Sequence, residues 1–131
     1  MKIAVDTNVL VRAAVCDDPV QAQAAAAVLR EAERVAVSLP CLCEFVWVLL
    51  RVYGFTGSEV AGAVRALLSA GNVEVDRAGA EAGLLVLEAG GDFADGVIAH
   101  EGYCLGGETF VSFDKRAVRI LAAQGHAVQL L

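Results

Sequence analysis

Five short apolar runs alternate with longer segments of helical periodicity, and this alternation is the feature that most constrains the fold. Strands that alternate with helices pair in parallel, because each helix carries the chain back to the start of the next strand. We therefore predict an α/β fold in which helices cover both faces of a parallel sheet. The expected strands span residues 3–5, 35–37, 73–75, 109–112 and 127–130.

Turn and cap residues bound the expected helices. Pro19 and Pro40 suit first helical turns, Thr56 is a good N-cap, and Gly54 and Gly125 end helices. No linker, repeat or low-complexity tract divides the chain of 131 residues, so we predict a single domain over residues 1–131. The expected helices span residues 9–15, 19–34, 41–53, 57–70, 78–89, 92–104 and 115–124.

The composition bounds the partners and the location. The formal net charge is −6, which argues against a broad basic face for nucleic acid. No apolar run reaches the length of about 18 residues that a membrane span needs, and no signal peptide is evident, so we expect a cytoplasmic protein. The hydrophobic fraction of 57% predicts that a partner or a second copy covers some apolar surface.

The cysteines do not have the spacing of a zinc site. No second Cys or His pair accompanies Cys41 and Cys43 at zinc-finger spacing. Small buried thiols are therefore expected at Cys16, Cys41, Cys43 and Cys104.

Acidic residues follow three of the expected strands. Asp6 ends the first, Glu44 lies just over one turn into the helix after the second, and Asp114 follows the fourth. The carboxyl ends of parallel strands share one edge of a sheet, so these three acids would converge there. Asp92 and Asp95 open the helix 92–104, where a spacing of three places them on one face.

Each acid also has a structural explanation. Asp6, Asp92 and Asp114 are all placed to cap helices and to complement the helix dipole. Glu44 and Asp95 lie among apolar residues, and we expect the helix around Glu44 to be apolar on nearly every side and buried. A buried lone carboxylate is costly unless it is paired or bound to a metal.

Clustered carboxylates favour Mg²⁺ or Mn²⁺, which prefer oxygen ligands. Such a site can activate water for attack on a phosphodiester. No glycine-rich phosphate loop, Ser-His-Asp set or zincin motif competes with it. His100 and His126 are expected to be surface or hydrogen-bonded histidines rather than catalysts.

Four motifs in order resemble the PIN-domain nucleases, especially the VapC toxins of VapBC-type toxin–antitoxin modules. They are VDTNVL at 5–10, EFVWVL at 44–49, DFADGVIA at 92–99 and TFVSFDK at 109–115. The resemblance implies a three-layer α/β/α domain with a five-stranded sheet of order 3-2-1-4-5, and metal-dependent cleavage of RNA. It makes Asp6, Glu44 and Asp95 the core ligands of Mg²⁺ (or Mn²⁺), Asp114 a more variable fourth ligand, Asp92 ancillary, and Thr7, Asn8 and Ser112 polar support.

One residue departs from the family pattern. Gly96 stands where alanine or a larger residue is usual, and glycine is a poor helix former, so we expect it to loosen the helix that presents Asp95.

The leading hypothesis is a metal-dependent endoribonuclease that is the toxin of a toxin–antitoxin pair. We expect it to bind a cognate antitoxin and to form a homodimer. Under this hypothesis four basic side chains either steer the RNA or are only solvated helix ends, namely Arg12, Lys115, Arg116 and Arg119. The alternative is a non-catalytic interaction module that binds a partner through the apolar helix around Trp47. A phospho-acceptor domain is the third reading, but it expects paired acids at the first strand and a lysine after the last, and neither is evident.

Overall fold

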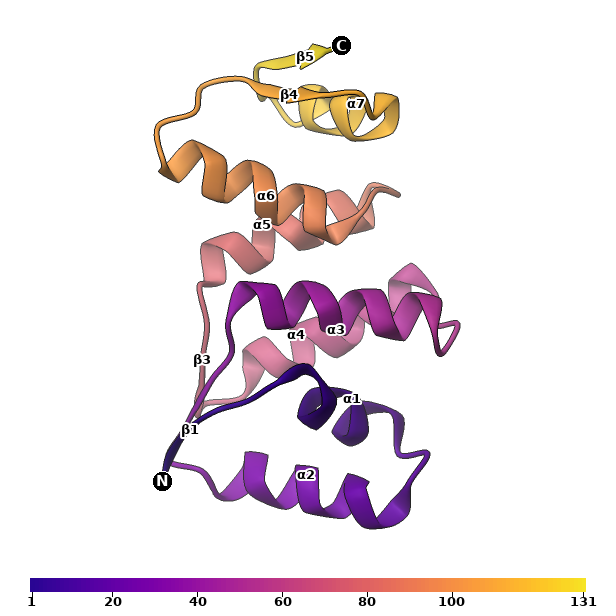
Figure 1. Cartoon of the computed structure of the whole chain (residues 1–131), viewed down its shortest axis with the longest axis vertical. Coiled ribbons are helices and arrows are strands. Elements are labelled where there is room, and N and C mark those ends of the chain that lie inside the picture. Colours follow the sequence, from indigo (N-terminus) through magenta and orange to yellow (C-terminus); the bar gives the residue numbers. More distant parts are fainter. The chain divides into compact units, whose positions relative to one another are not determined.

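The computed structural model describes all 131 residues, and the chain forms two compact units, Met1–Asp76 and Arg77–Leu131 (Figure 1). Both units combine helices with strands that pair in parallel. Every predicted helix and strand is present, with ends that differ from the prediction by a few residues. The α/β class is therefore confirmed.

The first unit contains a three-stranded sheet in which β1 pairs with β2 and β2 pairs with β3. Ile3 lies opposite Val35, and Val35 lies opposite Val73. Its elements are β1 (Lys2–Ala4), α1 (Thr7–Val15), α2 (Pro19–Glu31), β2 (Arg34–Ala36), α3 (Leu39–Arg51), α4 (Gly57–Ser69) and β3 (Val73–Glu74).

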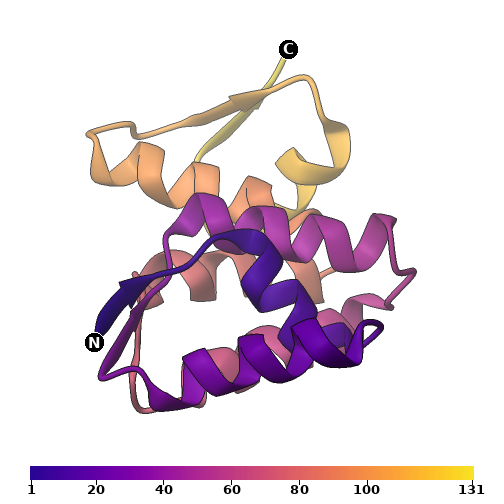
Figure 2. The same cartoon turned by 60° about the horizontal axis from the view of Figure 1, so that its bottom comes forward.

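The helices of the first unit pack in pairs, α1 against α2 and α3, and α3 against α4 (Figure 2). Polar side chains fix where these helices begin. Ser38 caps α3 by accepting a hydrogen bond from the amide of Cys41, and Thr56 and Glu59 form a reciprocal capping box at α4. Such caps satisfy amides that have no partner within the helix.

Burial in the first unit corrects two expectations. An apolar run such as residues 3–5 predicts a buried strand, but the residues of β1, which pairs with β2 in this unit, are exposed or half-buried. The helix α3 is not apolar on every side. Its buried residues form one stripe, so Glu44 and Trp47 on the opposite stripe are exposed. The buried stripe consists of Leu39, Cys41, Leu42, Phe45, Val46 and Leu49.

The second unit has a two-stranded parallel sheet, in which Val111 of β4 lies opposite Gln129 of β5. A buried cluster of Val86, Ala99, Ile120 and Leu121 forms a core against which Tyr103, Phe110 and Val128 pack. The elements of this unit are α5 (Arg77–Glu88), α6 (Phe93–Cys104), β4 (Phe110–Ser112), α7 (Lys115–Ala123) and β5 (Val128–Leu130).

The observed pairings agree with parts of the predicted strand order. The first sheet has the order 3-2-1 and the second pairs strands 4 and 5. A single five-stranded sheet of order 3-2-1-4-5 stays a prediction.

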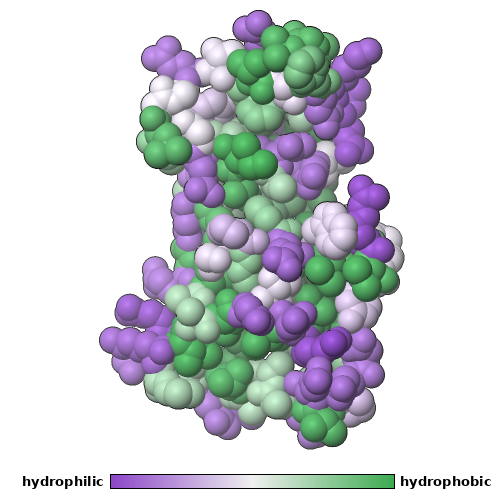
Figure 3. All heavy atoms as spheres, viewed as in Figure 1, coloured by the Kyte–Doolittle hydropathy of each residue, from purple (hydrophilic) through white to green (hydrophobic).

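Hydrophobic and hydrophilic residues are interspersed on the face that Figure 3 shows. Several large apolar side chains are exposed, including Val20, Trp47, Leu85, Leu105 and Phe113. None of the seven helices has both the length and the apolar character that crossing a membrane requires.

Two glycines allow α5 and α6 to approach closely. A Cβ atom on Gly83 would lie 2.6 Å from the ring of Phe93, and one on Gly96 would overlap the backbone carbonyl of Ala82. Gly96 is buried inside an unbroken helix. The expectation that it loosens α6 is therefore replaced by a packing role, because only glycine fits the contact.

We predict that Gly96→Ala destabilises the protein by about 1–3 kcal/mol, because overpacking against backbone outweighs the gain in helix propensity. Gly102→Ala on the same helix is the matched control, since a Cβ there meets nothing within 4 Å. The control is expected to stabilise by about 0.5–1 kcal/mol. Urea unfolding of both variants measures the difference, and equal effects at the two positions would contradict the packing role.

Candidate active site

Asp6 lies two residues after the end of β1 and caps α1. Its carboxylate accepts a hydrogen bond from the amide of Val9 at 3.4 Å, with an extended backbone at Asp6 itself. Asp6 and the nearby Asn8 are both exposed. The cap accounts for where Asp6 sits, and it leaves the carboxylate accessible to a ligand.

Glu44 lies near the N-terminal end of α3, on the exposed stripe of the helix. The prediction that Glu44 is buried is wrong, because the apolar stripe of α3 faces the other way. The cost of burying a charge therefore says nothing about the role of Glu44. Its accessibility to solvent is compatible with binding a cation.

Thr7 connects the helices that carry these two acids. It is buried, and its hydroxyl donates to the sulfur of Cys41 at 3.9 Å. Burial raises the pKa of the Cys41 thiol, the hydrogen bond from Thr7 lowers it, and the negative charges of Asp6 and Glu44 raise it. Both carboxylates are thus near enough to act on one thiol, close to the N-terminal ends of α1 and α3.

The other cysteines differ from Cys41. Cys16 and Cys104 are exposed and Cys43 is half-buried, so the prediction of buried thiols is right for Cys41 alone.

Asp92 and Asp114 cap helices of the second unit. Asp92 accepts from the amide of Ala94 at 3.2 Å, at the start of α6. Asp114 accepts from the amides of Arg116 and Ala117 at 2.9 and 3.1 Å, at the start of α7. The hydroxyl of Ser112 accepts from the amide of Asp114 at 2.9 Å, so Ser112 holds the turn between β4 and α7.

Asp95 lies in the first turn of α6 and is half-buried. Burial raises the pKa of its carboxyl, and the negative charges of Asp92 and Asp114 raise it further, while Arg116 lowers it. The charges of Asp92 and Asp114 therefore disfavour the ionised form of Asp95. A bound cation would relieve that repulsion.

The chemistry of these donors fits a hard divalent cation, since every candidate ligand is a carboxylate and none of the five forms an ion pair. Neither unit, taken by itself, gathers three or more His, Cys, Asp or Glu side chains closely enough to hold a metal ion. Within the first unit the donors are Asp6 and Glu44, and within the second they are Asp92, Asp95 and Asp114.

Arg12 belongs to a network that sequence reasoning missed. It donates to Gln21 at 2.7 Å, to Tyr53 at 3.1 Å and to Asp17 at 3.3 Å, and the hydroxyl of Tyr53 donates to Asp17 at 3.1 Å. Tyr53 lies 41 residues from Arg12, and no local pattern signals such a contact. Arg12 therefore joins α1 to α2 and to the turn that follows α3 rather than standing free for RNA. Lys115, Arg116 and Arg119 are exposed.

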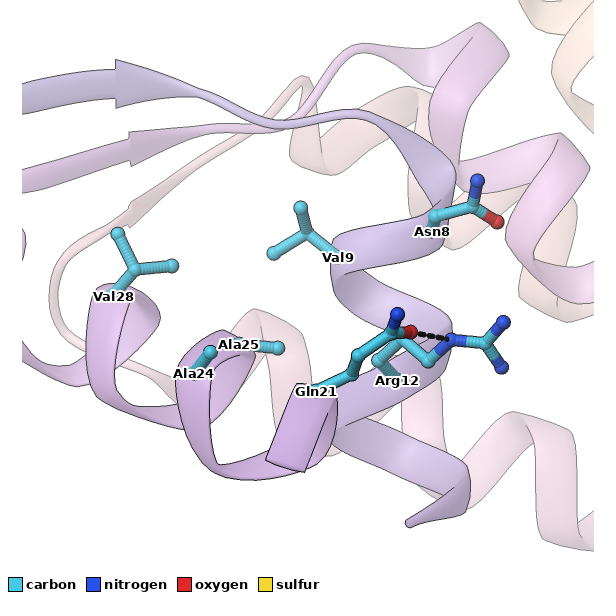
Figure 4. Close-up of a pocket in the computed structure, with 7 residues that line it drawn as sticks. All are labelled: Asn8, Val9, Arg12, Gln21, Ala24, Ala25 and Val28. Carbon is cyan, nitrogen blue, oxygen red and sulfur yellow. Dashed lines mark hydrogen bonds between the residues drawn. The ribbon is translucent and has the colours of Figure 1, made fainter. Parts of the chain in front are cut away.

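An open groove lies between α1 and α2 beside this network, with a volume of about 330 Å³. Figure 4 shows Arg12 and Gln21 turned toward each other at its rim. The residues that line the groove are Asn8, Val9, Arg12, Gln21, Ala24, Ala25 and Val28.

The sequence profile of one protein family, the PIN domain, matches residues 3–122 of the chain. None of the curated proteins matches the sequence of this chain. The matched segment includes Asp6, Glu44, Asp92, Asp95 and Asp114.

The raised pKa of Asp95 gives a prediction about pH. A carboxyl with a raised pKa binds its proton more tightly in the folded state, so its stabilising contribution is complete below 3.8, its ordinary value, and is lost as the pH rises through the raised pKa. We therefore expect the wild type to lose stability relative to Asp95→Asn as the pH rises through this window. Urea unfolding at a series of pH values with EDTA measures the difference in the free energy of unfolding between the two proteins. A wild type that becomes more stable relative to Asp95→Asn as the pH rises would contradict the raised pKa.

Proposed function

The chain belongs to the PIN domain family, and on that premise we propose that it is a metal-dependent endoribonuclease. PIN domains are generally nucleases, and they generally use divalent metals. The observation that carries the proposal is that the family match spans every acid of the candidate site. A member that had lost catalysis would have no need to keep all of them.

We assign Asp6, Glu44 and Asp95 as the core ligands of Mg²⁺ (or Mn²⁺), and Asp114 as a fourth, more variable ligand. The accessibility of Asp6 and Glu44, and the repulsion at Asp95, support this assignment. When bound, the cation would lower the pKa of a water and offset charge on the scissile phosphate.

The remaining residues would act by holding the acids. The buried hydroxyl of Thr7 donates a hydrogen bond to the sulfur of Cys41 and so would hold the first turns of α1 and α3 together. Ser112 fixes the turn that presents Asp114. We propose an ancillary role for Asp92, which caps α6 and whose charge raises the pKa of Asp95. The exposed Asn8 would supply a polar group beside Asp6.

We further propose that residues 1–131 form one PIN domain with strand order 3-2-1-4-5, acting in the cytoplasm as the VapC-like toxin of a toxin–antitoxin pair. The partial orders 3-2-1 and 4-5 support the strand order. Other exposed apolar side chains, such as Val20, Leu85 and Leu105, support partners that would cover them, a cognate antitoxin and a second copy of the chain. The same exposed side chains favour the second candidate function, a non-catalytic interaction module.

We predict that purified protein cleaves total cellular RNA into discrete fragments with Mn²⁺ or Mg²⁺ and that EDTA abolishes cleavage. Asp95→Asn should lower the rate by at least about 100-fold, the upper end of the effect of losing a residue that merely supports a metal ligand. Gel analysis of the RNA fragments over time measures the rate.

Glu101→Gln is the matched control, because it makes the same carboxylate-to-amide change at an exposed position of α6. It should cleave like the wild type. Cleavage by Asp95→Asn at the control rate would show that the site is misassigned. No cleavage by a wild type that still binds Mn²⁺ would favour the interaction module.

A further inference from the structure

Only two of the eight aromatic side chains are exposed, and each lies beside an acid of the proposed site. Trp47 and Phe113 have 57% and 79% of their surface accessible, whereas the other six are buried or half-buried. Leaving large apolar rings in water forgoes the stabilisation that burial would give. Fold stability therefore does not explain these two positions.

Trp47 shares a stripe of α3 with Glu44 and Arg51, since residues spaced by three and by seven lie on one helix face. All three are exposed. At a rise of about 1.5 Å per residue, Trp47 lies about 4.5 Å along the helix axis from Glu44, and Arg51 about 6 Å further. The stripe thus presents in order an acid, an aromatic face and a cation.

Phe113 is the exposed aromatic residue of the second unit, and it too lies next to an acid of the proposed site. It directly precedes Asp114 in the turn between β4 and α7, where Ser112 fixes the backbone. The turn therefore presents an exposed ring next to a capping acid whose position is set by three hydrogen bonds.

We propose that Trp47 and Phe113 each stack on a base of single-stranded RNA, with Arg51 contacting a phosphate beyond Trp47. This proposal rests on the proposed nuclease function, because it places the bases next to the acids that would act on the phosphate. Stacking on an aromatic ring is tolerant of sequence, since every base has a π-face.

The charge of the chain favours stacking as the means of holding RNA. The net charge is −6, with 10 Lys and Arg residues against 16 Asp and Glu residues, and Arg12 is already engaged with Asp17. Proteins that bind RNA mainly through phosphates need many cations, and their affinity falls steeply with salt. Stacking needs no net charge, so it can supply affinity for RNA that the few cations of this chain do not supply.

The test uses Trp47 itself, which is the only tryptophan of the chain and so the source of its tryptophan fluorescence. The probes are single-stranded 2′-O-methyl homopolymers of A, U, C and G with Mg²⁺, and the matching duplexes are controls. We expect saturable quenching by the single strands and none by the duplexes, whose bases are already stacked on one another.

Variants are compared by the anisotropy of labelled probes. Trp47→Ala and Phe113→Ala should each weaken binding about 5- to 150-fold, the range for losing one stacked base, while Trp47→Phe should retain most of the affinity. Val52→Ala is the matched control, since it removes an exposed apolar side chain at the end of α3 and should bind like the wild type. Wild-type affinity in both alanine variants, or no binding of any single strand by the wild type, would overturn the proposal.

The probes are read by binding, and a gel of each probe after titration checks that it is still intact, so this test is separate from catalysis. Stacking without cleavage of natural RNA would overturn the nuclease and leave the proposed RNA contact standing. Cleavage of RNA by Trp47→Ala and Phe113→Ala with the KM of the wild type would overturn the proposed RNA contact and leave the nuclease standing. If Trp47→Ala instead turns a dimer into a monomer in sedimentation while RNA affinity is unchanged, the stripe is an interface between copies and the RNA proposal is wrong.

Discussion

Carboxylates that lack a cationic partner repel one another, and the candidate site depends on how the chain holds them in place. Helix N-termini do this for three of the five acids, because Asp6, Asp92 and Asp114 all accept hydrogen bonds from free amides of the helix they begin. The positive end of the helix dipole stabilises each negative charge. The capping role and the proposed metal-binding role are therefore compatible, since a cap orients a carboxylate and leaves it exposed.

The sequence predicts the elements well because their signals are local. Apolar periodicity, Pro19, Pro40 and the Thr56 capping box place the helices, and the alternation of helices with short runs predicts parallel pairing, which is confirmed within each unit. Asp92 and Asp114 were recognisable as caps from their positions alone. These features depend on residues within a few positions of one another.

Features that depend on distant residues were not predictable in this way. The composition of α3 suggested burial on every side, but whether a stripe is covered is decided by the other elements, and Glu44 and Trp47 are exposed. The contact of Thr7 with Cys41 spans 34 residues, and it becomes visible only once α1 packs on α3. The prediction for Gly96 was wrong for the same reason. Helix propensity describes an isolated helix, whereas the role of Gly96 is set by its contact with the backbone of α5.

Mn²⁺ titration followed by electron paramagnetic resonance would show directly whether the acids bind a divalent cation. The free ion gives a strong signal that is lost on binding, so the dissociation constant can be measured for the wild type and for Asp6→Asn, Glu44→Gln, Asp95→Asn and Asp114→Asn. We predict that the first three substitutions each weaken Mn²⁺ binding strongly and that the fourth weakens it less. Binding that none of the four substitutions changes, or no binding by the wild type, would show that these acids do not form a cation site.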